Sequence, residues 1–143
     1  QLFGIVKGNV IKEGSDATII ACGLMVQEGI QASDILKKEY SISCKVIDMY
    51  SIKPLDIDLI CSSASETGAI ITIEEHNIIG GLGSAVCEVT AENCPVPVKR
   101  VGVMDIFGES ARDEELGQLL SKYGLKSDHI VESVIKTRRK LRK

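Results

Sequence analysis

The stretch AIITIEEHNIIGGLGSAV, residues 69–86, decides the fold of this chain. Its first part, residues 70–73, is a β-branched run of the kind found in buried parallel strands. Residues 74–77 are acidic and polar, and we interpret them as a loop. The glycine cluster at residues 80–84 then opens an apolar segment with helical spacing. A strand that leads through a loop into a helix is the unit on which open α/β sheets place binding surfaces.

The rest of the chain repeats this alternation of strand and helix. Such βα units predict a largely parallel sheet with helices on both faces, a single three-layer α/β/α domain. Four residues separate the first two strands, which is too few for a parallel crossover, so the first strand should run antiparallel. The five strands are expected at residues 8–12, 17–21, 44–48, 69–73 and 98–101. The helices are expected at residues 25–40, 55–67 with Gly68 as a left-handed cap, 82–93, 114–123 with a capping box at Ser110 and Asp113, and beyond a capping Ser127.

The composition is that of a globular domain with an aliphatic core. Of 143 residues, 44% are hydrophobic but only 3% aromatic, and Trp is absent. No apolar run approaches the roughly 20 residues that cross a bilayer, and no signal-peptide pattern opens the chain. The chain does not begin with Met, so we expect residues 1–143 to be one domain of a longer protein.

The cysteines predict neither a disulfide framework nor a zinc site. Their number is odd, no CxxC occurs, and each lies in or beside an apolar segment. We therefore expect free, buried thiols in a reducing cytoplasm. The five positions are Cys22, Cys44, Cys61, Cys87 and Cys94.

The net charge of −3 hides an asymmetry between the body and the C-terminus. Six of the last eight residues are basic, whereas the first 135 carry 11 basic and 20 acidic side chains, a balance of −9. Cations at a helix C-terminus complement the helix dipole. An acidic body would repel phosphate, so we interpret the basic end as a solvated helix terminus and expect no nucleic-acid binding.

The glycine cluster matches neither of the common phosphate-binding motifs. GGLGSA is not GxGxxG, and no GK[ST] of a P-loop follows. Free amides at the start of the helix near Gly83 could still hold an anion. The simpler interpretation is that the glycines let this helix pack closely against the sheet or a partner.

Glu74, Glu75 and His76 form the densest titratable group. Two carboxylates beside a histidine could act as acid and base, but neighbours in an extended chain point to opposite sides. No GxSxG elbow is present, so a self-contained hydrolase is not expected. At the carboxyl edge of the sheet, Glu75 and His76 would instead form part of a docking surface. Residues of two further loops would join them there: Asp48, Met49, Tyr50, Ser51, Asp105, Glu109 and Arg112.

Four segments, in order, resemble the C-terminal domain of transketolase, particularly that of split transketolases. They are DATIIACGLMV (residues 16–26), VIDMYSIKPLD (46–56), ITIEEHNIIGGLGSAV (71–86) and VPVKRVGVMDIFGES (96–110). The resemblance runs from about Gly8 to Val134. Similar segments occur in 1-deoxy-D-xylulose-5-phosphate synthase and in the beta chain of 2-oxoacid dehydrogenases. The residues of the two motifs IEEHNIIGGLGSAV and KRVGVMDIFGES favour transketolase.

The resemblance implies a three-layer sandwich whose five-stranded sheet has its first strand antiparallel. It also implies a cytoplasmic transferase of the pentose phosphate pathway that uses thiamine diphosphate and a divalent metal such as Mg. That enzyme moves two-carbon ketol units between sugar phosphates, as a dimer or another homo- or hetero-oligomer. Its cofactor, metal and catalytic glutamate belong to the pyrimidine-binding and diphosphate-binding domains, and this chain has no GDG-type metal loop.

For this chain the resemblance therefore implies no catalytic, cofactor or metal residue, and an isolated domain without activity. It implies a surface that docks on the catalytic domains, or that holds an anion. Two other interpretations stay open: a domain of one of the related enzymes above, and a stand-alone regulatory module that binds a nucleotide or phosphate. The residues expected at the surface are Glu75, His76, Gly80, Gly81, Gly83 and Ser84.

Overall fold

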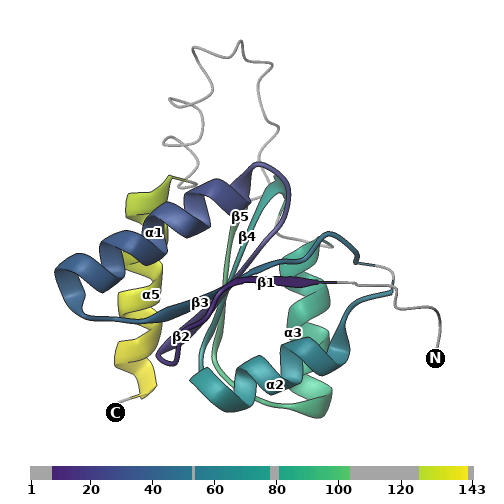
Figure 1. Cartoon of the computed structure of the whole chain (residues 1–143). Helices are drawn as coiled ribbons and strands as arrows, with labels where there is room; N and C mark the ends of the chain where they lie inside the picture. Colours follow the sequence, from purple (N-terminus) through teal and green to yellow (C-terminus); the bar gives the residue numbers. More distant parts are fainter. Residues whose placement is uncertain (1–7, 53, 78–80, 104–125, 142–143) are drawn as a thin grey trace, which may run out of the picture.

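The computed structural model describes residues 8–52, 54–77, 81–103 and 126–141 (Figure 1). Five strands form one sheet in the order β1-β3-β2-β4-β5. Helices α1 and α5 cover one face, and α2 and α3 cover the other (Figure 1). The strands are β1 (Asn9–Lys12), β2 (Ala17–Ala21), β3 (Cys44–Asp48), β4 (Ile70–Asn77) and β5 (Val98–Val103). The helices are α1 (Met25–Tyr40), α2 (Ile57–Thr67), α3 (Leu82–Asn93) and α5 (Ser127–Leu141).

The predicted direction of the first strand is confirmed. β1 pairs antiparallel with β3, and the remaining neighbours in the sheet are parallel. β1 does not pair with β2, its neighbour in sequence, because β2 already has β3 on one side and β4 on the other. The short turn between β1 and β2 therefore carries the chain to the outer edge of β3.

Alternation along the strands divides the core between the two faces. Ile19 and Ile71 pack toward α1 and α5, whereas Ile20 and Ile70 pack toward α2 and α3. Side chains of one strand point to opposite faces at successive positions, so this division continues to the strand ends. It decides what Glu74 and Glu75 can reach at the end of β4.

The expected loop at residues 74–77 is wrong, because β4 continues through it to Asn77. Asn77 pairs with Val103 of β5 after an irregularity in register that follows Ile73. A carboxylate can stay in a buried strand only when it is hydrogen-bonded, and Glu74 is. β5 also extends past its expected end at Val101, because Val103 pairs with Asn77 of the longer β4. The helix expected at residues 114–123 and its capping box lie outside the described residues.

Two helix starts also differ from expectation. α2 begins at Ile57, since Asp56 caps it by accepting from the Leu59 amide at 3.1 Å. Ser127 is the first residue of α5 and not the cap before it, and its amide donates to Glu28 Oε1 of α1 at 3.0 Å. None of the described helices combines the length and the apolar character that a membrane span requires.

The expectation of free thiols is wrong for two of the five cysteines. Cys61 on α2 forms a disulfide with Cys94, the C-cap that follows α3, with a Cα–Cα distance of 5.6 Å. The sequence separates them by 33 residues, so only the side-by-side packing of α2 and α3 brings them together. Cys22, Cys44 and Cys87 are free as expected.

The two helix C-termini that end in left-handed backbone suggest a stabilising substitution. Gly68 caps α2 with φ of 75°, as predicted, but exposed Ser41 caps α1 with φ of 56°. A Cβ in this region is strained, so Ser41→Gly is expected to raise the free energy of unfolding by about 0.5–1 kcal/mol. Urea unfolding measures the change. Gly68→Ala is the reverse control and should lower the free energy of unfolding by about 1 kcal/mol. If Ser41→Gly left the free energy of unfolding unchanged, strain at Ser41 would be contradicted.

Candidate functional site

Glu74 occupies the start of α3, where the sequence suggested an anion site. Its side chain is 1% exposed, and its two oxygens accept from the backbone amides of Leu82 and Gly83, each at 2.7 Å. Charged acceptors at a helix N-terminus are stabilised by short hydrogen bonds and by the helix dipole. These amides are therefore taken by the protein's own carboxylate. The amides of Leu82 and Gly83 are thus not free for an external anion, and the arrangement does not fit the diphosphate of a thiamine cofactor.

Gly83 has a packing role. A Cβ at this position would lie 2.8 Å from Thr72 Oγ1 and 2.8 Å from Arg100 Cγ, which is closer than such atoms approach. The absence of a side chain thus lets α3 approach the sheet closely enough for Glu74 to reach the amides. At Gly83 the structure agrees with the interpretation that a glycine serves close packing. Gly83 is buried, and half-buried Ser84 accepts from Arg100 Nη1 at 3.4 Å.

Glu75 projects to the opposite face from Glu74. It is exposed, and its Oε1 accepts from the amide of Leu24, just before α1, at 3.2 Å. The two carboxylates therefore serve two different helices and do not share a pocket for acid–base chemistry. Gly81 is the half-buried N-cap of α3. Gly80 and the side chain of His76 lie outside the described residues, as do Asp105, Glu109 and Arg112.

Exposed apolar side chains lie at the same edge of the sheet as Glu75. Leu24 follows β2 and is 59% exposed, and Tyr50 and Ile52 follow β3 at 56% and 38%. Ile57, the first residue of α2, is 46% exposed. With Glu75, these four residues form what we call the carboxyl-edge surface.

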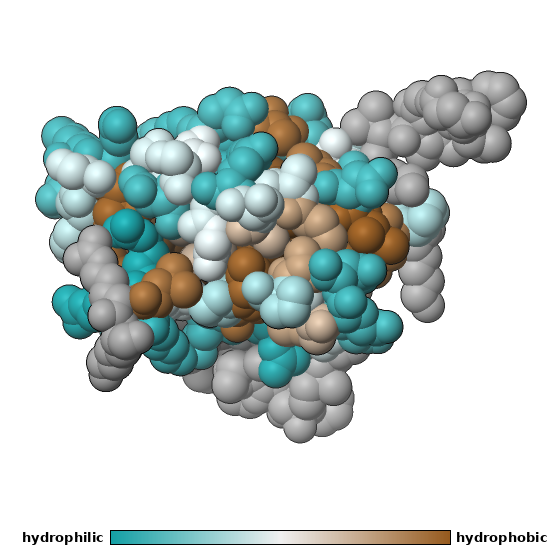
Figure 2. All heavy atoms as spheres, turned by 90° about the horizontal axis from the view of Figure 1, so that it is seen from below, coloured by the Kyte–Doolittle hydropathy of each residue, from teal (hydrophilic) through white to brown (hydrophobic). Residues whose placement is uncertain are grey.

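Sequence reasoning included Tyr50 at this edge but missed Leu24, Ile52 and Ile57. A signal was available, because each is a large apolar residue in or beside a loop, where helical or strand spacing does not require it. The face seen from below in Figure 2, where α5 ends, instead shows apolar side chains in separate groups among polar ones.

The reactive groups at this edge are poorly suited to catalysis. Burial raises the pKa of the Cys22 thiol to about 11, and the charges of Glu74, Glu75 and Asp48 add to the effect. A thiol with such a pKa stays protonated at neutral pH and is a weak nucleophile. Within the part of the chain that the structure describes, no three His, Cys, Asp or Glu side chains gather as a metal site would require.

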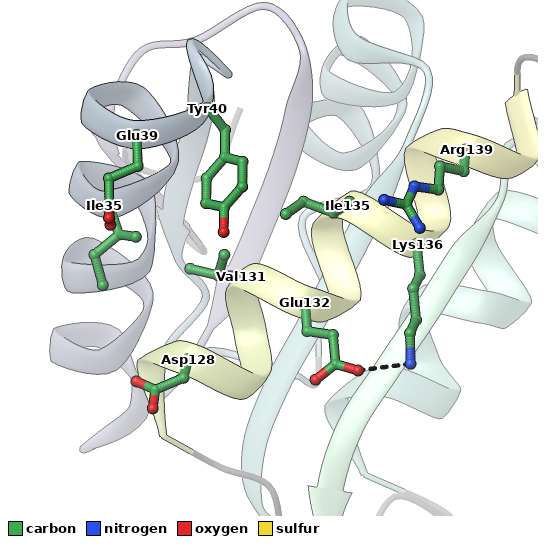
Figure 3. Close-up of a pocket in the computed structure, with 9 residues that line it drawn as sticks. All are labelled: Ile35, Glu39, Tyr40, Asp128, Val131, Glu132, Ile135, Lys136 and Arg139. Carbon is green, nitrogen blue, oxygen red and sulfur yellow. Dashed lines mark ion pairs between the residues drawn. The ribbon is translucent and has the colours of Figure 1, made fainter.

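A groove of about 580 Å³ lies elsewhere, between α1 and α5. Figure 3 shows Tyr40, Val131 and Ile135 between the two helices, while Glu132 and Lys136 project from the other side of α5. Glu132 and Lys136 form an ion pair at 2.7 Å. None of the residues expected from the sequence lines this groove, so the carboxyl-edge surface remains the candidate site.

Comparison with known proteins gives one consistent result. The family model described as "Transketolase, C-terminal domain" matches residues 6–130. The 6-deoxy-6-sulfo-D-fructose transketolase subunit SqwH of Clostridium sp. (strain MSTE9) is 41% identical over 131 residues, 92% of this chain and 39% of that protein. The 1-deoxy-D-xylulose-5-phosphate synthase of Syntrophotalea carbinolica is 42% identical over 131 residues, 91% of this chain and 20% of that protein.

A solved structure agrees in fold and in sequence. The protein titled "Split gene transketolase, inactive beta4 tetramer" aligns with a TM-score of 0.84 and 47% identity, over 92% of this chain and 41% of that chain. This chain thus spans about two fifths of the transketolase subunit and of the split-gene transketolase chain, and a smaller share of the synthase.

Proposed function

Because the chain belongs to the transketolase C-terminal domain family, we propose that residues 1–143 are the C-terminal domain of a transketolase. That enzyme would transfer two-carbon ketol units between sugar phosphates, using thiamine diphosphate and a divalent metal. The observation that carries the proposal is identity of 41% to a transketolase subunit and 47% to a split transketolase, each over 92% of this chain.

In this proposal the domain is not catalytic, and the pyrimidine-binding and diphosphate-binding domains hold the cofactor and metal. Glu74 supports this division, since it satisfies the α3 amides that would otherwise suit a diphosphate. The raised pKa of Cys22 supports it as well. The isolated domain is expected to be inactive, whereas the assembled protein is expected to transfer ketol units.

The carboxyl-edge surface is the part that we propose to dock on the catalytic domains, together with His76, Gly80 and Gly81 of the original prediction. Its apolar side chains come from loops after two parallel strands and from the start of α2. Large exposed apolar residues that gather on one side of a domain are typical of an interface. Glu75 would lie among them as a polar contact, with one oxygen already held by Leu24.

Charge placed on this surface should break the assembly. The double variant Leu24→Glu/Tyr50→Glu is expected to weaken association with the catalytic part by about tenfold or more, because it buries two carboxylates without partners. Sedimentation and reconstituted ketol transfer measure the effect, and activity should recover at high protein concentration.

The matched control is Tyr40→Glu/Leu141→Glu, which adds the same charge at residues that are 52% and 45% exposed on α1 and α5. It should leave association within about twofold of the parent. If both double variants lost the same affinity for the catalytic part, or if neither lost any, docking through the carboxyl-edge surface would be contradicted.

1-Deoxy-D-xylulose-5-phosphate synthase is the second candidate, favoured by the 42% identity to the Syntrophotalea enzyme. The two reactions can be separated directly. A transketolase transfers ketol units between sugar phosphates, whereas the synthase forms 1-deoxy-D-xylulose 5-phosphate. Formation of 1-deoxy-D-xylulose 5-phosphate, without ketol transfer between sugar phosphates, would favour the synthase.

We further propose a dimer or a larger oligomer, a cytoplasmic location and a role in the pentose phosphate pathway. A split-transketolase relative is titled a tetramer, and one relative's name refers to a sulfosugar, so donor sugars should be surveyed broadly. In a reducing cytoplasm Cys61 and Cys94 would be present as free thiols, because disulfides are rare there. Counting the free thiols of the protein in freshly lysed cells tests the location.

A further inference from the structure

A second groove, of about 350 Å³, lies between β5 and α5. β5 is an edge strand of the described sheet and forms one wall, and α5 forms the other. Lys99 of β5 lines the groove together with Lys136 and Lys140 of α5. We call it the basic groove. It shares no residue with the carboxyl-edge surface.

The register of β5 shows which side chains face the basic groove. Lys99 pairs with Ile71 and Val101 with Ile73, and both isoleucines belong to the core cluster that packs on α5. Arg100 points to the other face, where its side chain lies beside Gly83 and donates to Ser84. The charge on the β5 wall therefore comes from the Lys99 ammonium group.

The basic groove carries more positive than negative charge. Glu132 is the acidic residue among those that line it, and it forms an ion pair with Lys136 at 2.7 Å. Among the described residues, exposed Lys99 and Lys140 have no ion-pair partner. Two ammonium groups without ion-pair partners are thus left, one on the β5 wall and one on the α5 wall.

Neutral polar groups of α5 complete the lining. Ser133 and Thr137 of α5 also line the basic groove, and each carries a hydroxyl group. His129 also lines the basic groove, and its Nδ1 is buried without a hydrogen-bond partner among the described residues. Val101 supplies an apolar contact. A small volume with a few convergent polar groups beside an apolar surface is typical of a ligand site.

We propose that the basic groove binds a small phosphate monoester. Such an anion carries close to two negative charges at neutral pH, which matches the two lysines without ion-pair partners. Its three oxygens can accept from both ammonium groups and from the hydroxyls, while its organic part rests on Val101. The volume of about 350 Å³ is in the range of sites for small metabolites. Occupancy would join α5 to the edge of the sheet and so stabilise the domain.

The test is calorimetric titration of the protein with glycerol 3-phosphate, with glycerol as the uncharged comparison. Saturable binding of the phosphate ester alone is expected. Lys99→Gln/Lys140→Gln should weaken it by about tenfold or more, because both counter-charges are removed. The matched control Lys37→Gln/Lys38→Gln removes the same charge from exposed positions on α1 and should change the dissociation constant by less than about twofold.

Several outcomes would overturn the proposal. They are no saturable binding below about 10 mM, equal weakening by both double variants, or tighter binding of succinate than of glycerol 3-phosphate. Unchanged thermal unfolding of Lys99→Gln/Lys140→Gln without ligand would show that its loss of binding is not a loss of fold. Ketol transfer and docking do not involve these lysines, so a negative result here leaves the proposed function intact.

Discussion

Glu74→Gln is expected to lower the free energy of unfolding by about 2–3 kcal/mol. Glu74 is 1% exposed, and each of its two carboxylate oxygens accepts a hydrogen bond from a backbone amide at 2.7 Å. Glutamine has almost the same shape but one acceptor oxygen. Its NH₂ group would face a backbone N–H of α3, and that buried donor would lose its partner.

Urea unfolding measures this effect, and Glu75→Gln is the matched control one residue away. Glu75 is exposed and accepts a single amide at 3.2 Å, so its replacement should cost less than about 1 kcal/mol. Comparable losses at both positions would show that the burial of Glu74 does not matter. A negligible loss at Glu74 would show that the start of α3 is stabilised by other contacts.

Reduction of the Cys61–Cys94 disulfide is expected to lower the free energy of unfolding by about 3–4 kcal/mol, because the bond closes a loop in the unfolded chain and so restricts its conformations. The two residues are 33 apart in sequence, and the bond joins α2 to the end of α3. Thermal unfolding with and without dithiothreitol should therefore show a clear drop in Tm for the parent protein. Cys61→Ser should lower the Tm and abolish the response to the reductant.

Cys87→Ser is the control, because Cys87 is free and its variant should respond to dithiothreitol as the parent does. Thiol titration of the unfolded protein gives a second measurement. Three thiols should react before reduction and five after it, in agreement with the three free cysteines. Five reactive thiols without reductant would contradict the disulfide.

The regular elements were predictable where hydrophobic periodicity and turn residues coincide. The bounds of α1, β2 and β3 agree with the expectation from the sequence, and so does the antiparallel direction of β1. The end of β4 was not predictable in this way. Polar residues at 74–77 read as a loop, and only a helix start eight residues further on makes a buried Glu74 possible.

The residues predicted for the candidate site have different surroundings in the structure. Glu75 lies at the carboxyl edge as expected, whereas Gly83 is buried and serves packing. The apolar members Leu24, Ile52 and Ile57 belong to segments that the sequence keeps apart. Their common exposure depends on what the other elements leave uncovered, which local patterns do not report.

The sequence by itself determined the strand and helix order, the parallel sheet, the direction of β1 and the family, because these follow from local periodicity, short connections and ordered motifs. The tertiary structure decided the pairing of Cys61 with Cys94, the carboxylate that fills the start of α3, and the lysines that line the two walls of the basic groove. Each of these joins positions whose distance depends on how helices pack on the sheet. Packing is a property of the whole chain, so no single segment encodes it.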